Sequence, residues 1–170
     1  MAGLPATGKS AISCRLKQEL ACVLLDKDQI RACLFAEHVE YSREQDDLCV
    51  NAMYEVARYH LQRRPASPVI LDGRTYSRHY QIVAVKNAAA HANVPICFIE
   101  CVCSPETARY RINLNKGAHI AKDRDEILYE KSRAAAEPIT EHRLILNTDK
   151  NTKDQCTQTA LAYIKTQLKC

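Results

Sequence analysis

The stretch Gly3-Leu4-Pro5-Ala6-Thr7-Gly8-Lys9-Ser10 decides the fold, because it matches G-x-x-x-x-G-K-[ST], the pattern of a nucleotide phosphate loop. Two of the chain's four glycines lie here, where they let the backbone wrap an anion. The amides of the whole stretch are predicted to bind the β-phosphate of ATP, helped by the amino end of the helix that follows. Lys9 is predicted to bridge the β- and γ-phosphates, and the Ser10 hydroxyl to ligate Mg²⁺.

Only Met1 and Ala2 precede this loop, although a phosphate loop normally follows a buried central strand. The sequence therefore predicts that the first strand is truncated. We expect the reading frame of the gene to encode further residues ahead of Met1. The alternative is that the fold survives with four strands and leaves an exposed groove.

Beyond the loop, short apolar runs alternate with segments of helical periodicity. The expected strands are 21–26, 68–73, 94–103 and 143–149. The expected helices are 9–20, 29–35, 42–64, 77–92, one that opens at 104–106, 125–137 and 152–168. Continuously apolar strands that alternate with helices predict an α/β fold of three layers, in which helices cover both faces of a parallel sheet.

Helix boundaries and helix faces can also be predicted from particular residues. Ser42 with Gln45, and Thr152 with Gln155, have the spacing of capping boxes. Ser77 is expected to cap the helix that ends at 92. The apolar stripe expected to bury the helix 42–64 is Leu48, Ala52, Met53, Val56 and Tyr59 or His60.

An acid closes the second expected strand, at Asp72. A carboxylate at the carboxyl edge of a parallel sheet is the Walker-B arrangement, within reach of Mg²⁺ directly or through water. The alternative is a solvated turn residue, because Asp72 precedes Gly73 and Asp-Gly is a common turn.

Two more acids, Asp26 and Asp28, follow the first expected strand. Asp28 is predicted to accept the proton of an attacking hydroxyl, as phosphoryl transfer to an alcohol requires. Arg31 lies three residues on, along the same helix face, and could hold an anionic acceptor through two hydrogen bonds. The alternatives are a helix cap for Asp28 and a surface side chain for Arg31.

Basic residues cluster at about 109–125, between two expected helices, and include Arg109, Arg111, Lys116, His119, Lys122 and Arg124. A lid of this kind can close on a triphosphate and stabilise the charge of the transition state. Arg111 and Arg124 are the predicted catalytic arginines. The alternative is a solvated helix face.

Composition limits the class of protein. The 170 residues are enough for one domain, 1–170, and the net charge of +4 suits an anionic substrate but not a nucleic-acid coat. The nine cysteines show no metal-binding spacing and are expected to be reduced thiols. With no apolar run of 18 residues, no membrane partner is expected, and the protein is expected to be soluble and cytoplasmic.

The stretches GLPATGKS, LLDKDQIR and VILDGRT, followed by the arginine-rich segment, resemble the small P-loop kinases. Within them, the chain is similar to the group that includes adenylylsulfate kinase, the kinase domain of polynucleotide kinase and many uncharacterised predicted kinases. This resemblance covers nearly the whole chain. It implies a P-loop NTPase fold that binds ATP with Mg²⁺.

The segment 26–31, DKDQIR, stands where adenylylsulfate kinases carry Asp-Gly-Asp-Asn-[IV]-Arg, with Lys and Gln in place of Gly and Asn. The match implies Asp28 as the base and Arg31 as a contact to the acceptor. The stretch KGAHIAKDRDEILYEKSRAAAEPI resembles the lid and following helix of the predicted kinases. The resemblance also implies that residues 148–150 approach the adenine.

These features predict an ATP-dependent kinase that transfers the γ-phosphoryl group to a hydroxyl of a small, anionic acceptor. A polynucleotide end is not expected but stays open as the acceptor. The alternative is a nucleotide-binding switch or NTPase, or an inactive relative, that has no acceptor.

Overall fold

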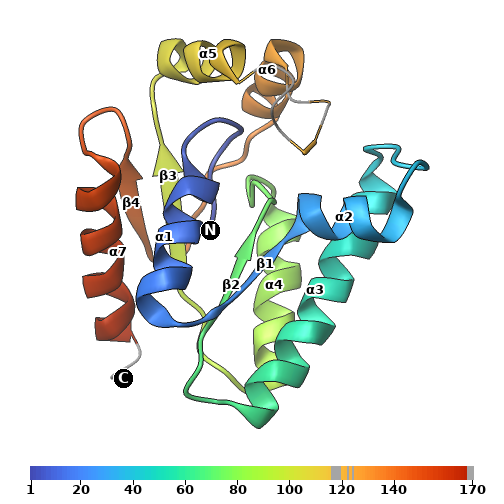
Figure 1. Ribbon diagram of the computed structural model, residues 1–170, viewed down its shortest axis with the longest axis vertical. Helices are drawn as coiled ribbons and strands as arrows, with labels where there is room; N and C mark the ends of the chain where they lie inside the picture. The colour runs from blue at the N-terminus through green and yellow to red at the C-terminus, as the bar shows by residue number, and fades with distance from the viewer. Residues whose placement is uncertain (116–119, 122, 124, 168–170) are drawn as a thin grey trace.

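The computed structural model describes residues 1–115, 120, 121, 123 and 125–167, and its elements alternate as the sequence predicts (Figure 1). The strands are β1 (Val23–Asp26), β2 (Val69–Asp72), β3 (Phe98–Val102) and β4 (Arg143–Asn147). The helices are α1 (Lys9–Leu20), α2 (Lys27–Phe35), α3 (Arg43–Arg63), α4 (His79–Ala92), α5 (Pro105–Leu114), α6 (Glu126–Ala134) and α7 (Lys153–Gln167).

The sheet is parallel and has two halves, β1 with β2 and β3 with β4. Residues 1–3 join the halves. The Ala2 amide donates to the Ile99 carbonyl at 2.7 Å, and the Cys101 amide donates to the Ala2 carbonyl at 2.9 Å. On the other side, the Met1 amino group donates to the Leu71 carbonyl at 2.9 Å. The order across the sheet is therefore β1, β2, residues 1–3, β3, β4, with three residues in the place of a central strand.

Helices cover both faces of the sheet, which confirms the expected α/β fold. Neighbouring residues of a strand point to opposite faces. Ile70 and Ile99 pack in a core cluster with α1 and α7, whereas Leu71 and Phe98 pack in a second cluster with α4. Figure 1 shows α5 and α6 above the carboxyl ends of the strands.

The buried face of α3 differs from the expected stripe. Leu48, Val56 and Tyr59 are each about half exposed. Met53, a member of the expected stripe, is buried as predicted, but the other buried side chains of the helix are Gln45, Cys49, Val50 and Ala57. Both rows carry apolar residues at helical spacing, so periodicity alone did not distinguish them. Ion pairs from the first turn of α3, described below, hold the second row toward the protein.

Only one of the two expected capping boxes forms both of its hydrogen bonds. Thr152 and Gln155 form both bonds, since the Thr152 amide donates to Gln155 Oε1 at 2.8 Å and the Gln155 amide to Thr152 Oγ1 at 3.2 Å. Ser42 accepts from the Gln45 amide, but the Gln45 side chain accepts from the Glu40 amide instead of that of Ser42. The chain turns back at this point, and Gln45 stabilises that turn rather than the helix end.

The expectation for Ser77 is wrong by one residue. Helix α4 begins after Arg78, which makes no side-chain capping bond. The Ser77 hydroxyl is instead within 2.9 Å of the Thr75 hydroxyl, in the loop that follows β2. A local serine–threonine bond has replaced the cap.

Candidate functional site

The first residue of the phosphate loop, Gly3, has a backbone conformation and surroundings that only glycine accepts. Gly3 has a φ of +127°, and a Cβ added there would lie 2.2 Å from the Cys101 carbonyl oxygen. Gly8, with a φ of +91°, forms the amino-terminal cap of α1. The two glycines of the motif therefore shape the loop as the sequence predicts.

Lys9 turns back into the loop. Its ammonium donates to the carbonyls of Gly3 and Leu4, both at 2.7 Å, and the residue is buried. The positive charge is therefore held inside the turn of the loop. This is the position in which the predicted contact with phosphate oxygens requires a cation.

Arg111 comes to the phosphate loop from α5. Its guanidinium donates to the Ala6 carbonyl at 3.3 Å, to Thr148 Oγ1 at 2.9 Å and to the Thr148 carbonyl at 3.0 Å. The Thr148 hydroxyl in turn lies 3.1 Å from the Thr7 carbonyl, to which it donates. Reasoning from the residues missed Thr148; its place at the carboxyl end of the last strand was the available signal.

A cavity of about 320 Å³ lies between the phosphate loop, α5 and the start of α6. Its lining residues are Pro5, Ala6, Gly8, Lys9, Ser10, Ala11, Arg111, Ile112, Asn115 and Asp125. Ser10 and Arg111 therefore share one cavity with the loop. Asn115 and Asp125 were not singled out from the sequence. Arg124, together with Lys116, His119 and Lys122, lies outside the described residues.

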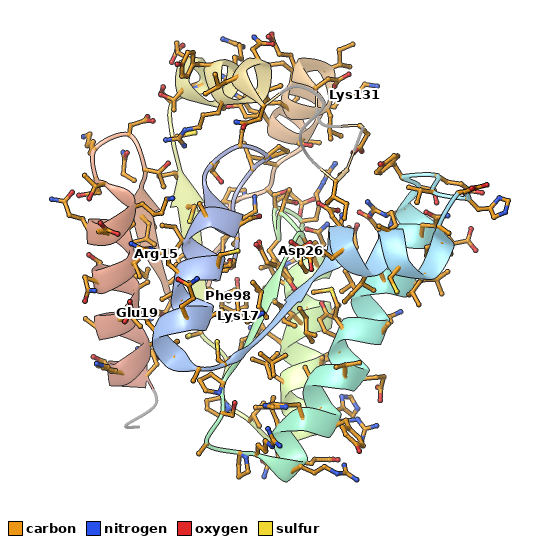
Figure 2. The ribbon with its side chains drawn as sticks, in the orientation of Figure 1. Arg15, Lys17, Glu19, Asp26, Phe98 and Lys131 are labelled. Atoms are coloured by element: carbon orange, nitrogen blue, oxygen red, sulfur yellow. The ribbon has the colours of Figure 1, made fainter. Side chains whose placement is uncertain are left out.

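The acids at the strand ends meet across the sheet. Asp26 and Asp72 are register partners on β1 and β2. Burial raises the pKa of the Asp26 carboxyl, and the nearby Asp72 and Asp28 carboxylates raise it further. Figure 2 labels Asp26 where β1 ends and α2 begins. It caps α2 by accepting from the amides of Asp28 and Gln29.

Asp72 fits a divalent cation. It is 1% exposed, and neither carboxylate oxygen has a hydrogen-bond partner among the described residues. A buried carboxylate without partners is costly, and a cation removes that cost. The described residues contain no cluster of three or more metal-ligating side chains. That agrees with Mg²⁺, which takes one or two protein carboxylates and completes its shell with phosphates and water.

Asp28 lies among cations at the start of α2. Arg31 NH1 is 3.2 Å from Asp28 Oδ1, and Lys27 Nζ is 3.6 Å from the same oxygen. Asp46, from the first turn of α3, pairs with both Arg31 and Lys27. Burial lowers the pKa of Lys27, while Asp28 opposes that shift. All three residues of α2 in this cluster are buried.

Arg74 adds a further buried cation beside this cluster. Its guanidinium pairs with Asp47, the neighbour of Asp46, and lies 5.5 Å from the ring centre of Tyr80. Sequence reasoning missed Arg74 and Lys27. Their closeness to Asp72 and Asp28 in the sequence was the available signal.

Comparison with known proteins gives the family. The model of the AAA domain family matches residues 1–139. The chain belongs to this family. The match includes the phosphate loop, both strand-end acids and Arg111. A search of curated proteins gave no match.

Solved structures show the same fold as this AAA domain. A "putative kinase" from Chloroflexus aurantiacus J-10-fl has a TM-score of 0.75 at 22% identity, over 98% of this chain and 95% of that one. The Mycobacterium tuberculosis APS kinase, in complex with AMPPNP and APS, has a TM-score of 0.68 at 16% identity, over 96% and 94%. A gluconokinase from Sinorhizobium meliloti 1021 has a TM-score of 0.67 at 12% identity, over 95% and 87%.

These comparisons confirm two expectations for this member of the family. The α/β architecture is that of P-loop proteins, and the solved structures that share it include proteins named as kinases. Among the described residues, no helix is both long and apolar enough to cross a bilayer.

Proposed function

We propose that the protein is an ATP- and Mg²⁺-dependent kinase that transfers the γ-phosphoryl group to a hydroxyl of a small, anionic acceptor. One observation carries the proposal. The phosphate loop and the Asp28–Arg31 pair lie at the same carboxyl edge of the sheet, which also holds Asp26 and Asp72. This shared edge supports a donor site that adjoins a base with its own cation.

On the donor side, the amides of residues 3–10 and the Lys9 ammonium bind the β- and γ-phosphates. Ser10 and Asp72 would hold Mg²⁺, which supplies positive charge to the phosphates. Arg111 contacts the loop from α5 and stabilises charge on the transferred group.

On the acceptor side, Asp28 takes the proton of the attacking hydroxyl. The hydroxyl oxygen forms a bond to the γ-phosphorus, the bond from this phosphorus to the β–γ bridging oxygen breaks, and ADP leaves with that bridging oxygen. Arg31 keeps the Asp28 carboxylate in place through its 3.2 Å contact. Lys27, which shares Asp28 and Asp46 with Arg31, stabilises the same carboxylate.

Buried cations support an anionic acceptor. Lys27, Arg31 and Arg74 are all buried, and two neighbouring acids of α3 pair with them. An acceptor anion can take the place of Asp46 on Arg31, because a guanidinium binds two oxygens of a carboxylate or of a phosphate with the same pair of N–H groups. The names of the solved kinases describe those proteins. Their structures show that this chain has a fold in which other proteins transfer phosphoryl groups.

We propose that residues 1–170 form one domain, with a lid at about 109–125. Residues 109–114 belong to helix α5, so the described part of the lid begins as a helix. Burial raises the pKa of Asp123, and the Asp28 carboxylate raises it further, which supports a lid that reaches the acceptor side. Arg124 is proposed to close on the phosphates together with Arg111.

The experiment is ADP release from ATP and Mg²⁺, with and without a panel of sulfated, phosphorylated, carboxylated and uncharged polyols, and 5′-hydroxyl oligonucleotides. A kinase shows ADP formation that an acceptor stimulates. Asp28→Asn should lower that stimulated rate by ~100-fold or more, with the ATP dissociation constant unchanged. The matched control is Glu44→Gln, an exposed acid on the first turn of α3. Slow hydrolysis that no acceptor changes would favour the switch or NTPase instead.

A further inference from the structure

Two buried arginines near the carboxyl ends of β1 and β2 make the same incomplete set of contacts. Arg31, on α2, is 3% exposed, and Arg74, which closely follows β2, is 4% exposed. Arg31 pairs through Nη2 with Asp46 of α3. Arg74 pairs through Nη2 with Asp47, the next residue of the same helix. The Nε nitrogen of each arginine is buried and has no hydrogen-bond partner among the described residues.

The unused nitrogen matters because of the way in which arginine binds anions. A guanidinium holds a carboxylate or a phosphate best through two parallel N–H bonds, and Nε with Nη2 is one such pair of donors. In Arg31 and Arg74 an aspartate lies at Nη2, whereas Nε is left without an acceptor. A buried donor without a partner is costly. An anion that presents one oxygen to each nitrogen would remove this cost at both arginines.

The two aspartates can leave these positions more easily than the arginines can. The side chains of Asp46 and Asp47 are 29% and 37% exposed, whereas that of each arginine is 4% exposed. A displaced carboxylate can therefore turn toward water and regain its hydration. The guanidinium that it leaves stays buried and requires another anion.

Both arginines lie within the span of one small molecule. Their partners Asp46 and Asp47 are consecutive residues of α3, whose Cα atoms are about 3.8 Å apart. Burial lowers the pKa of Lys27, and the Arg31 and Arg74 guanidinia lower it further, so the three cations are close to one another. One ligand can therefore contact both guanidinia.

We propose that Arg31 and Arg74 are two anion subsites for the acceptor, which is therefore a small hydroxylated molecule with two separate anionic groups, each a carboxylate or a phosphate. Asp46 and Asp47 hold these subsites in the empty protein, and the acceptor displaces them. The inference rests on the proposed function for the reacting hydroxyl. It adds Arg74 as a residue that determines which acceptor binds.

Charge balance favours two anionic groups over one. In the empty protein, three carboxylates, those of Asp28, Asp46 and Asp47, pair with the three buried cations of this cluster. A ligand with a single anionic group that displaced both aspartates of α3 would leave one buried guanidinium without a counter-ion. Arg31 contacts Asp28 through Nη1 at 3.2 Å, so an anion on Nε and Nη2 leaves the proposed base in place.

The test measures the binding of small acids to the full chain by calorimetric titration. The two-anion probes are malate and glycerate phosphorylated at its terminal hydroxyl. The one-anion controls are lactate and glycerol phosphate. Each titration is repeated with Lys9→Ala, because a phosphate group can also bind the phosphate loop. We expect each two-anion probe to bind ~10-fold or more tightly than its control, whether or not Lys9 is present.

Asp47→Asn is the decisive variant. It keeps an oxygen beside Arg74 but removes the charge that competes with the ligand, so the two-anion probes should bind ~10-fold more tightly than they do to the native chain. Asp154→Asn is the matched control, because it removes an exposed acid that pairs with Arg15 and changes the net charge equally. Arg74→Lys keeps the charge but not the paired donors, so it should weaken the two-anion probes ~10-fold and leave the one-anion controls within about twofold.

Equal affinities of the native chain for the two-anion and one-anion probes would overturn the proposal. So would an Asp47→Asn variant that binds no more tightly than Asp154→Asn, which is the result that a purely structural Asp47–Arg74 pair predicts. ADP release with the same acids separates this inference from the proposed function. Tight binding of malate without ADP release would contradict the kinase and keep the subsites, whereas equal stimulation by lactate and malate would support the kinase and contradict the subsites.

Discussion

Thr148 accepts a hydrogen bond from Arg111 and donates one to the phosphate loop at the Thr7 carbonyl. One hydroxyl thereby joins three elements that are far apart in the sequence: α5, the loop after β4 and the phosphate loop. Its methyl group also lies against Gly8, at 3.4 Å from where a Cβ would be. Thr148 therefore holds Arg111 against the phosphate loop.

Replacing Thr148 should weaken nucleotide binding through the loop. Thr148→Val keeps the methyl contact with Gly8 but removes the hydrogen bonds of the hydroxyl with Arg111 and with the carbonyls of Thr7 and Val102, so we expect ATP to bind about 10-fold more weakly. Thr148→Ser keeps the hydroxyl and is the matched control. Calorimetric titration with ATP and Mg²⁺ measures the difference. Equal affinities for the two variants would show that the hydroxyl does not hold the loop.

Removing the charge of Asp72 should have opposite effects with and without metal. Asp72→Asn abolishes a buried, unpartnered carboxylate, so the metal-free protein should become more stable by ~1–3 kcal/mol. The same change should remove most of the extra thermal stabilisation that Mg²⁺ adds to ATP. Thermal unfolding with ATP, with and without Mg²⁺, measures both effects. An unaltered response to Mg²⁺ would place the metal elsewhere.

Asp26 should make stability depend on pH. Its pKa is raised in the folded protein, so the fold binds this proton more tightly than the unfolded chain does. The stability it contributes is present below the usual carboxyl pKa and is lost as pH rises through the raised value. Asp26→Asn keeps the helix cap, since Asn accepts the same bonds.

We therefore expect Asp26→Asn to stabilise the metal-free protein at pH 7 by a few tenths to about 1 kcal/mol, the range for like charges opposite one another in a sheet. The gain should shrink at pH 4, because the raised pKa means that the native carboxyl is more fully protonated there than at pH 7. Urea denaturation at both pH values tests this. A gain of the same size at pH 4 would exclude the charge as its cause.

The two glycines of the phosphate loop should differ in their tolerance of a side chain. Gly3→Ala places a Cβ against the Cys101 backbone, so it should cost roughly 2–4 kcal/mol of folding stability. Gly8→Ala meets the Thr148 side chain, whose methyl group is nearest at 3.4 Å, and should cost roughly 1–2 kcal/mol, from its positive φ. Chemical denaturation compares them, and the reverse order would contradict the loop geometry.

The phase of α3 can be tested by paired truncations. Met53 is fully buried, so Met53→Ala should cost about 2–5 kcal/mol of folding stability. Leu48 is 53% exposed, so Leu48→Ala should change stability by no more than about 0.5 kcal/mol. Equal losses in chemical denaturation would mean that Leu48 is covered by a partner in solution.

Sequence reasoning predicted the order of the elements because apolar runs that end in an acid and helices with capping residues leave local signals. Asp26, Asp72 and Ser104 lie where their spacing placed them. The phase of α3 was not predictable in this way. Its first turn is oriented by Asp46 and Asp47, whose buried cationic partners, Arg31 and Arg74, belong to other segments of the chain.

The candidate site was likewise predictable only in part. The loop residues and the strand-end acids follow from a motif and from parallel topology. Thr148, Lys27 and Arg74 do not, because their importance arises from contacts across 19 to 141 positions of sequence. Periodicity and spacing carry no information on such contacts.

The three residues that hold the half-sheets together are also the first three of the chain. Chain ends are usually the part of a protein that tolerates trimming and tags best. Here the reverse holds, because Met1 and Ala2 carry the bonds that keep β2 and β3 aligned. Deleting residues 1 and 2 would therefore remove the hydrogen bonds to Leu71, Ile99 and Cys101 that connect the two half-sheets.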